Sequence, residues 1–418
     1  MGRRKKSNLN RKLNKILLFM TALLIVLIAI TYVDSKILNN KANDNSSSIT
    51  DPQNNTNPSD DNNIPLEDTS TDSPGSPQAG DRSDEKDEPQ ADDIVDIEEP
   101  LPAKPIVLAF AGDVNFDEDS KPVARYDREN KGILGGISED LVNEMNEADI
   151  FMLNNEFAYS TRGREIIEKS YTFRADPKRV EILKEMGVDI VSLANNHALD
   201  FREEALLDTF TTLDEAGVDY VGAGVNMNRA KAPIYYTIGD TTIAYVAASH
   251  VIYAMDWYAT DTRPGMIGTY DPALFVTSIK EAKENSDFVV VYVHWGKERT
   301  HEPVSYQKNL AKIYIDAGAD AVIGCHPHVM QGIEFYKGKT IAYSLGNYWF
   351  NASKRESGLL KIYINPDGST ETQLLPAMND NTYTYMITEG DARESYFKFM
   401  EDISFNVKFD EKGFVSEK

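Results

Sequence analysis

The sequence is poor in cysteine and in positive charge. Cys325 is the only cysteine among 418 residues, which excludes an intrachain disulfide framework and, because it lies far from the N-terminus, a lipoprotein signal. The formal net charge of −24 at pH 7 argues against non-specific binding to nucleic acid or to anionic membrane surfaces, so we expect no nucleic-acid partner. Histidine is scarce too, with six residues, and their positions are therefore informative.

One long uncharged run lies near the N-terminus. Residues 1–15 carry seven basic side chains and no acidic one, and residues 16–33 carry no charge. That length just allows a helix to cross a bilayer. We expect a single-pass cell-membrane protein with residues 1–15 in the cytoplasm and the C-terminal domain outside, in a Gram-positive bacterium because disulfides are absent. A cleaved signal peptide is the alternative, although residues 32–36 form a poor cleavage sequence.

Residues 34–104 are rich in Asn, Asp, Ser, Pro, Thr and Glu and poor in large apolar side chains. Such a segment cannot bury enough surface to offset chain entropy, so we predict a disordered acidic linker. A spacer through a cell wall and a generic linker would look the same. We assign residues 105–378 to a globular domain with a sizeable core. Residues 379–418 form its C-terminal extension, in which we expect no more than a helix and a strand.

From Ile106 onward, short apolar runs alternate with amphipathic segments of helical length. Early βαβ units followed by meanders indicate an α/β protein with a mixed sheet or two packed sheets. Ser138 is placed to cap the first predicted helix. The predicted strands are 106–111, 150–153, 189–193, 218–221, 233–238, 242–248, 288–293, 321–323, 332–336, 340–344 and 359–364, and the predicted helices are 138–147, 177–186, 203–216, 272–284 and 304–317.

Five short segments place metal-ligand residues directly after hydrophobic runs, at what we interpret as strand ends. They are Gly112-Asp113, Asn154-Asn155-Glu156, Asn195-Asn196-His197, His294-Trp295-Gly296 and His326-Pro327-His328. Four of the six histidines fall in these segments. Open α/β sheets bind ligands at the carboxyl edge of their strands, so the five segments predict one shared site that holds two metal ions.

The two carboxylates are the first candidate ligands. An ionised carboxylate at the end of a buried strand is costly unless it is paired or bound to a metal, and this applies to both Asp113 and Glu156. Glu156 is the candidate for bridging two cations. The alternatives are a turn or capping role for Asp113 and a surface position for Glu156.

The amide and the imidazoles complete the candidate set. Asn196 offers a hard neutral oxygen, and His197 is a candidate general acid or phosphate-orienting group, although helix capping would also explain this pair. His294 alone would be interpreted as a core histidine. His326 and His328 change that interpretation, because a His-x-His on an extended chain points both rings to the same side.

This donor set also suggests which metals bind and what they do. Mixed oxygen and nitrogen ligands favour one or two ions of Mn, Fe or Zn over Ca. Two cations held close together activate a bridging water and clamp the oxygens of a phosphoryl group, and His197 lies where a leaving-group oxygen would need a proton. We interpret Cys325 as a small buried residue beside the site rather than as a ligand, and His250 and His301 as ordinary residues.

Seven motifs, in order, give a specific resemblance. They are GDVNFD, NNEFAYS, YTFRADP, SLANNHALD, VHWGKE, GADAVIGCHPHVMQGIE and YSLGNYWF. Over about residues 106–351 the chain resembles the CapA family, the capsule-synthesis proteins of poly-γ-glutamate biosynthesis, which share the calcineurin-like metallophosphoesterase fold. The resemblance implies a sandwich of two mixed β-sheets flanked by helices, with a metal centre at the strand ends.

The resemblance assigns roles residue by residue. It implies metal-binding roles for Asp113, Glu156, Asn196, His294, His326 and His328, a catalytic role for His197, and substrate-binding positions in the cleft for Arg174 and Asn347. Two departures stand out. Many phosphoesterases of this fold have Asp-x-His after the first strand, where this chain has Asn115. The family's Gly-His-His-Pro-His is Gly-Cys-His-Pro-His here, with Cys325 at the first histidine.

Three functions fit the sequence. The first is a metal-dependent phosphoesterase-like hydrolase acting on a cell-envelope polymer or its carrier in capsule synthesis. The second is a non-catalytic assembly, export or anchoring subunit that works beside the membrane subunits of a capsule-polymer synthetase and contacts an anionic envelope polymer. The third is a metal-free scaffold.

Overall fold

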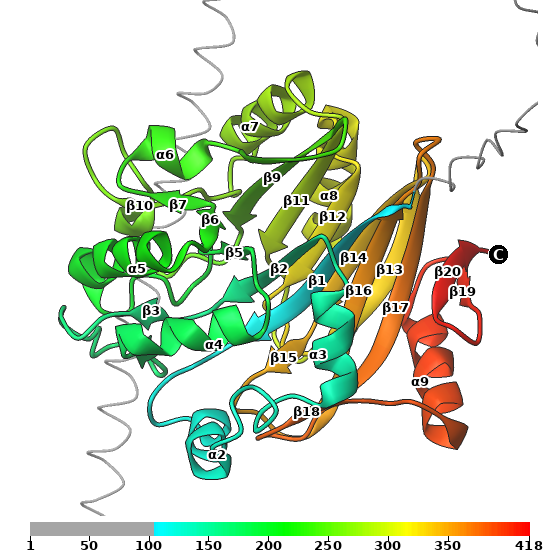
Figure 1. Ribbon diagram of the computed structural model, residues 1–418. Coiled ribbons are helices and arrows are strands. Elements are labelled where there is room, and N and C mark those ends of the chain that lie inside the picture. The colour runs from blue at the N-terminus through cyan, green and yellow to red at the C-terminus, as the bar shows by residue number, and fades with distance from the viewer. Residues whose placement is uncertain (1–103) are drawn as a thin grey trace, which may run out of the picture. The chain divides into compact units, whose positions relative to one another are not determined.

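The computed structural model describes residues 104–418 (Figure 1). The predicted cytoplasmic segment, the predicted transmembrane helix at 16–33 and all but the last residue of the predicted linker lie outside the described residues. Within residues 104–418 no helix is long and apolar enough to cross a membrane. The longest, α5 (Arg202–Ala216), has 15 residues, fewer than a bilayer span needs. This finding contradicts the predicted membrane localisation.

The larger sheet has ten strands, with the path β19-β20-β17-β16-β1-β2-β5-β6. Strands β1, β2, β5 and β6 run parallel, and β16, β17, β20 and β19 continue the sheet in antiparallel pairs. The other two strands, β15 and β18, pair with β1 and β17. The bounds are β1 Ile106–Val114, β2 Ile150–Asn155, β5 Ile190–Ser192, β6 Asp219–Val221, β15 Asn347–Trp349, β16 Arg355–Ile364, β17 Thr370–Asn379, β18 Thr384–Met386, β19 Val407–Phe409 and β20 Phe414–Glu417.

The second sheet has six strands in the order β13-β14-β12-β11-β9-β8. Its four central strands are parallel, and β8 and β13 pair antiparallel at the edges, so both sheets are mixed. The predicted strands 233–238 and 242–248 are confirmed as β8 and β9, which pair antiparallel. The bounds are β8 Ile234–Ile238, β9 Thr241–Ser249, β11 Phe288–His294, β12 Ala321–Cys325, β13 Met330–Tyr336 and β14 Lys339–Leu345.

The two sheets pack face to face. Strand β11 contributes side chains to two hydrophobic cores, one between the sheets and one beneath the outer helices. Val290 and Tyr292 point into the core shared by the two sheets, and the tyrosine hydroxyl donates to the carbonyl of Ala111 at 2.7 Å. Val289 and Val291 point the other way and pack beneath α7 (Ala273–Glu284) and α8 (Ser305–Ala317). A strand buried on both faces has no polar alternation, which explains its unbroken apolar sequence.

Helices cover the outer faces of this sandwich. In Figure 1, α3, α4 and α5 lie against the larger sheet, and α9 lies beside β19 and β20. The architecture of two mixed sheets flanked by helices is confirmed. The remaining elements are α2 Lys121–Glu129, α3 Glu139–Asn146, α4 Val180–Glu185, α6 Met227–Lys231, α9 Gly390–Ile403, short 3-10 turns at Pro177–Arg179 and Met255–Trp257, and two-residue strands β3 Ala158–Tyr159, β4 Arg174–Ala175, β7 Ala223–Gly224 and β10 Gly265–Met266.

Two local predictions differ from the structure. Helix α2 was not predicted, because it buries only Pro122 and Val123 and so carries no apolar periodicity. Ser138 precedes α3, but its side chain makes no capping bond to that helix. Its hydroxyl instead accepts a hydrogen bond from the backbone N–H of Met386 in β18, at 3.2 Å. The Ser138 side chain thus bonds to a distant strand instead of to the first turn of α3.

A close backbone approach fixes the end of β1. A Cβ added at Gly112 would lie 1.9 Å from the carbonyl oxygen of Gly346, and the N–H of Asp113 donates to that same oxygen at 2.9 Å. Only glycine allows this contact, which places the next residue, Asp113, at the junction of the two sheets.

We therefore expect Gly112→Ala to lower the free energy of unfolding by about 3 kcal/mol, because two backbone segments would have to separate. The measurement is urea denaturation. Gly368→Ala is the control: it has φ +80 but open space around it, so left-handed strain alone should cost about 1 kcal/mol. Equal losses in the two variants would contradict the role given to the Gly112–Gly346 contact.

Candidate metal centre

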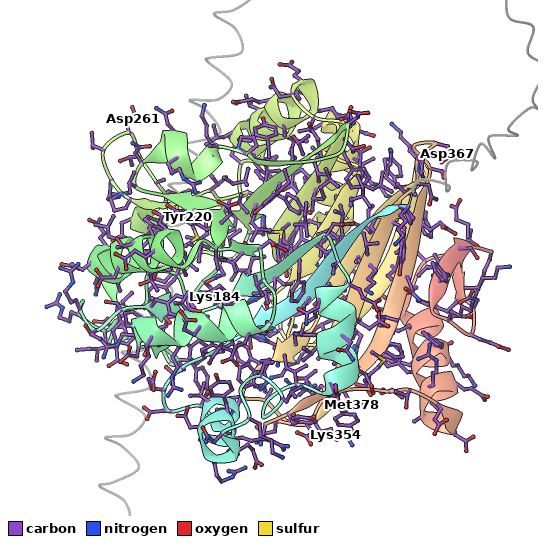
Figure 2. The ribbon with its side chains drawn as sticks, viewed as in Figure 1. Lys184, Tyr220, Asp261, Lys354, Asp367 and Met378 are labelled. Carbon is purple, nitrogen blue, oxygen red and sulfur yellow. The ribbon has the colours of Figure 1, made fainter. Side chains whose placement is uncertain are left out.

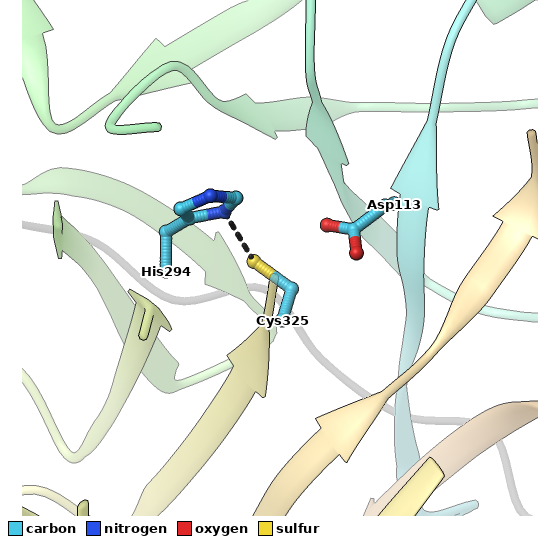
Figure 3. Close-up of side chains that lie close together, drawn as sticks. All are labelled: Asp113, His294 and Cys325. Atoms are coloured by element: carbon cyan, nitrogen blue, oxygen red, sulfur yellow. Dashed lines mark hydrogen bonds between the residues drawn. The ribbon is translucent and has the colours of Figure 1, made fainter. Parts of the chain in front are cut away.

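Ligand-type side chains from both sheets meet at the carboxyl ends of their strands. Three groups of residues have potential ligand atoms within 4.8 Å of one another. They are Asp113, His294 and Cys325; Glu156, His294 and His326; and Asp113, Glu156 and His328. Figure 3 shows the first group, in which the three side chains project toward one another from β1, β11 and β12. The five predicted ligands other than Asn196 are therefore brought together.

Asp113 is fully buried and fully engaged. One carboxylate oxygen accepts a hydrogen bond from the Asn154 side chain at 2.7 Å. The other accepts from the backbone N–H of His326 at 3.2 Å and lies 3.3 Å from Nδ1 of His328. Burial by itself would raise the pKa of Asp113, but the hydrogen bond and charge of His328 outweigh it and lower that pKa. Asp113 is therefore ionised at neutral pH.

Glu156 has the opposite surroundings. Both of its carboxylate oxygens are buried, and neither has a hydrogen-bond partner among residues 104–418. Its Oε1 lies 3.6 Å from Nε2 of His294 and 4.0 Å from Nε2 of His328. Burial, and then the negative charge of Asp113, raise the pKa of Glu156 well above its usual value. Buried polar atoms without partners are rare in folded proteins, and a cation between these residues would satisfy both oxygens.

The His-Pro-His turn is held in an unusual backbone conformation. His326 has φ 95 and His328 has φ 57, where residues other than glycine are uncommon. Nδ1 of His326 is buried without a partner in the described part of the chain. Burial and the charge of His328 lower the pKa of His326 to about 3, which keeps the ring neutral and able to bind a metal. Strain of this kind is typical of functional sites.

His328 also contacts a residue of β15, through the same ring nitrogen that faces Asp113. Its Nδ1 lies 2.7 Å from the amide oxygen of Asn347. Burial would lower the pKa of His328, but Glu156 and Asp113 together outweigh it and raise the pKa to about 10. The two carboxylates thus keep the His328 ring protonated, so its positive charge lies where a bound cation would lie.

His294 connects the two sheets. Its Nε2 lies 2.6 Å from the amide oxygen of Asn196, which joins that predicted ligand to the cluster. Its Nδ1 lies 3.2 Å from Sγ of Cys325 and 3.4 Å from the side-chain nitrogen of Asn154.

Asn154 was not among the predicted site residues, yet it contacts Asp113, His294 and Asn195. Its place opposite Asp113 in the β1–β2 pairing is the signal that could have identified it.

His197 lies at the edge of the cluster. Its Nδ1 is 2.7 Å from a carboxylate oxygen of Asp200, and its ring packs against Phe173 with centroids 4.2 Å apart. Burial lowers the pKa of His197 to about 4, so the ring is neutral at pH 7. With Nδ1 directed at Asp200, Nε2 is the ring nitrogen left for a ligand.

Lys169 is a second site residue that sequence reasoning missed. Its ammonium group lies 2.5 Å from Asp200 and 3.0 Å from Nδ1 of His197, and it also donates to the carbonyl of Asn196. Its side chain is only 9% exposed, and burial lowers its pKa. Lysines are common on surfaces and the loop 160–173 has no strand pattern, so nothing in the sequence indicated this buried position.

A cavity of about 230 Å³ adjoins the cluster and is lined in part by His197, His328 and Asn347. Arg174 is not among the residues that line it: its guanidinium lies 4.2 Å from the centre of the Phe201 ring and donates to the carbonyl of Arg162 at 3.3 Å. Asn115 is buried, and its amide oxygen accepts from the N–H of Asp117 at 2.8 Å.

Comparison with known proteins places the chain in a family. The model of the bacterial capsule synthesis protein PGA_cap matches residues 107–352, which include every candidate site residue named above. The chain belongs to this family. It is 35% identical over 213 residues to the PGA biosynthesis protein CapA of Bacillus subtilis, covering 50% of this chain and 56% of that one. It is 34% identical over 216 residues to the capsule biosynthesis protein CapA of Bacillus anthracis, covering 50% and 52%.

The chain thus spans about half the length of these two relatives. Among solved structures, a putative 5'-nucleotidase from Staphylococcus aureus is 16% identical, with a TM-score of 0.43 over 71% of this chain and 58% of that one. At that score we base no argument on the likeness.

The buried Lys169–Asp200 pair makes a prediction about stability. Lys169→Met would leave the fully buried Asp200 carboxylate without its cation, and we expect the free energy of unfolding at pH 7 to fall by about 3 kcal/mol. The control is Lys184→Met in α4, labelled in Figure 2, which removes an exposed pair with Glu181 and should change stability by less than about 0.5 kcal/mol. Similar losses in both variants, measured by urea denaturation, would contradict a structural role for the buried pair.

Proposed function

We propose that this chain is a metal-dependent hydrolase of phosphoester-type bonds that acts in the synthesis of a capsule polymer. The observation that carries the proposal is Glu156, whose two buried oxygens have no partner among the described residues although three imidazoles surround it. The names of the related proteins support the capsule context. The predicted calcineurin-like metallophosphoesterase fold agrees with this reading.

The donor set fits two metal ions that share Glu156. Glu156, His294 and His326 would hold one, with the Asn196 oxygen beside His294, and Asp113, Glu156 and His328 would hold the other. Imidazole and carboxylate ligands together favour Mn, Fe or Zn. We leave Cys325 out of the set, because it belongs only to the group with Asp113 and His294, which does not contain Glu156.

The protein residues divide the remaining work. When bound, a metal pair supplies an activated water and neutralises charge on the phosphoryl oxygens. Asp200 holds the proton of His197 on Nδ1, so Nε2 can accept a proton and return it to the leaving-group oxygen. Lys169 fixes the position of Asp200, which in turn orients the His197 ring. We also propose an anionic capsule polymer and subunits of its synthetase as partners.

The first test is metal content, measured by elemental mass spectrometry on untagged protein. We expect one to two equivalents of Mn, Fe or Zn in the wild type and the loss of at least one of them in His326→Ala. His301→Ala is the control, because His301 contacts the Met330 carbonyl and lies outside the three ligand groups. Wild-type protein that binds no metal after reconstitution would contradict the proposal.

The second test is turnover of bis(p-nitrophenyl) phosphate by metal-loaded protein. His197→Asn should lower kcat about 100-fold or more, because it removes the proton carrier, while the metal content stays unchanged. If that variant keeps its metal and its turnover, His197 has no catalytic role. If the wild type holds its metal and hydrolyses no phosphoester, a non-catalytic assembly subunit becomes the better description.

A further inference from the structure

We propose that the cavity beside the metal centre binds a second anionic group of the substrate, and that Arg299 and Arg355 hold it. The inference rests on the proposed function, since it concerns the part of the substrate next to the bond that is hydrolysed. It names a substrate class: molecules that carry a carboxylate or phosphate close to the reacting group.

The cavity joins the metal centre to the two arginines. Its lining includes His197, His328 and Asn347 from the site described above, together with Arg299 and Arg355. A ligand bound at the metals would therefore extend into a space that contains both guanidinium groups. The volume, about 230 Å³, is smaller than that of drug-sized ligand pockets, so we infer that it receives one small acidic unit.

Ordered backbone positions both arginines. Arg299 follows β11, has φ 59, and its N–H donates to the carbonyl of Pro327 at 2.8 Å, which ties its loop to the His-Pro-His turn. Arg355 is the first residue of β16 and is paired in register with Asn379 of β17. Arg355 lies beyond residues 107–352, so this arginine is outside the region that matches the family model.

Both arginines keep their charges free of partners in the part of the chain that the structure describes. Within residues 104–418, neither guanidinium makes an ion pair or a side-chain hydrogen bond, whereas Arg162 and Arg179 pair with carboxylates. Glu298 also lines the cavity, but it forms no ion pair with either arginine. In a chain with a net charge of −24, two unpaired guanidinium groups beside the site provide a local positive field.

A third donor and an apolar wall complete the cavity. The side-chain nitrogen of Asn347 is buried without a partner among the described residues, and Asn347 lines the cavity. Phe173 and Phe350 line it as well and offer apolar surface to a hydrocarbon portion. Guanidinium forks match the two oxygens of a carboxylate or phosphate, so the set suits an oxyanion on a short aliphatic arm.

Calorimetric titration of the purified full chain tests this inference with two probes, a five-residue γ-linked glutamate oligomer and inorganic pyrophosphate. We expect Arg299→Gln and Arg355→Gln each to weaken binding of at least one probe about tenfold or more, and the double variant to weaken it further. The control, Arg128→Gln, makes the same change in net charge at an exposed arginine and should leave affinity within about twofold.

The probes identify the source of the anion. A loss confined to the glutamate oligomer assigns the cavity to carboxylates, and a loss confined to pyrophosphate assigns it to phosphates. If the double variant binds both probes as the wild type does, or if the wild type binds neither, the inference is overturned. The titration needs no turnover, so it is separate from the test of hydrolysis: arginine-dependent binding can persist in a protein that hydrolyses nothing, and metal-dependent turnover can persist in variants that bind normally.

Discussion

The structure depends on how two carboxylates are removed from water where two sheets meet. The Asp113 carboxylate accepts hydrogen bonds from the backbone N–H of His326 and the amide of Asn154, and it lies beside the His328 imidazole. The Glu156 carboxylate accepts no hydrogen bond from the described residues. Burial of a charge without a partner is costly, so a cluster of this kind persists only when the surrounding fold is stable enough to hold it. The packed core on both faces of β11 and the close Gly112–Gly346 approach supply that stability.

The strain of the His-Pro-His turn follows from the same constraint. Two imidazoles face one cluster from a short segment after β12, and the backbone has positive φ at both histidines. Asn347 then fixes one of these rings through its amide oxygen. The turn is therefore a rigid part of the site, since β12, β15 and the Arg299 loop all hold it in place.

The sequence predicted the frame of the fold and most of the cluster, for a physical reason. Parallel strands buried on both faces have unbroken apolar runs, and a polar residue that ends such a run must lie at the sheet edge, so Asp113, Glu156 and His294 could be located without a structure. Lys169 could not, because its role depends on side-chain contacts with residues 27 to 31 positions further along the chain, made from a loop without a strand pattern. Arg174 was expected in the cleft by resemblance alone, and its contacts with Phe201 and Arg162 direct it elsewhere.

The pairing of β1 has a consequence for synthesis on the ribosome. Ile106 pairs with Ile364 and Phe110 with Leu360, so one edge of β1 has its antiparallel partner only after roughly 250 further residues have been made. At ordinary translation speeds this is a delay on the order of ten to fifty seconds. During that time an apolar strand has an unpaired edge, which is the kind of surface that chaperones bind and that aggregates form through. The nascent chain is therefore most vulnerable before β16 emerges, even though the site ligands of β1, β2, β11 and β12 have by then all been synthesised.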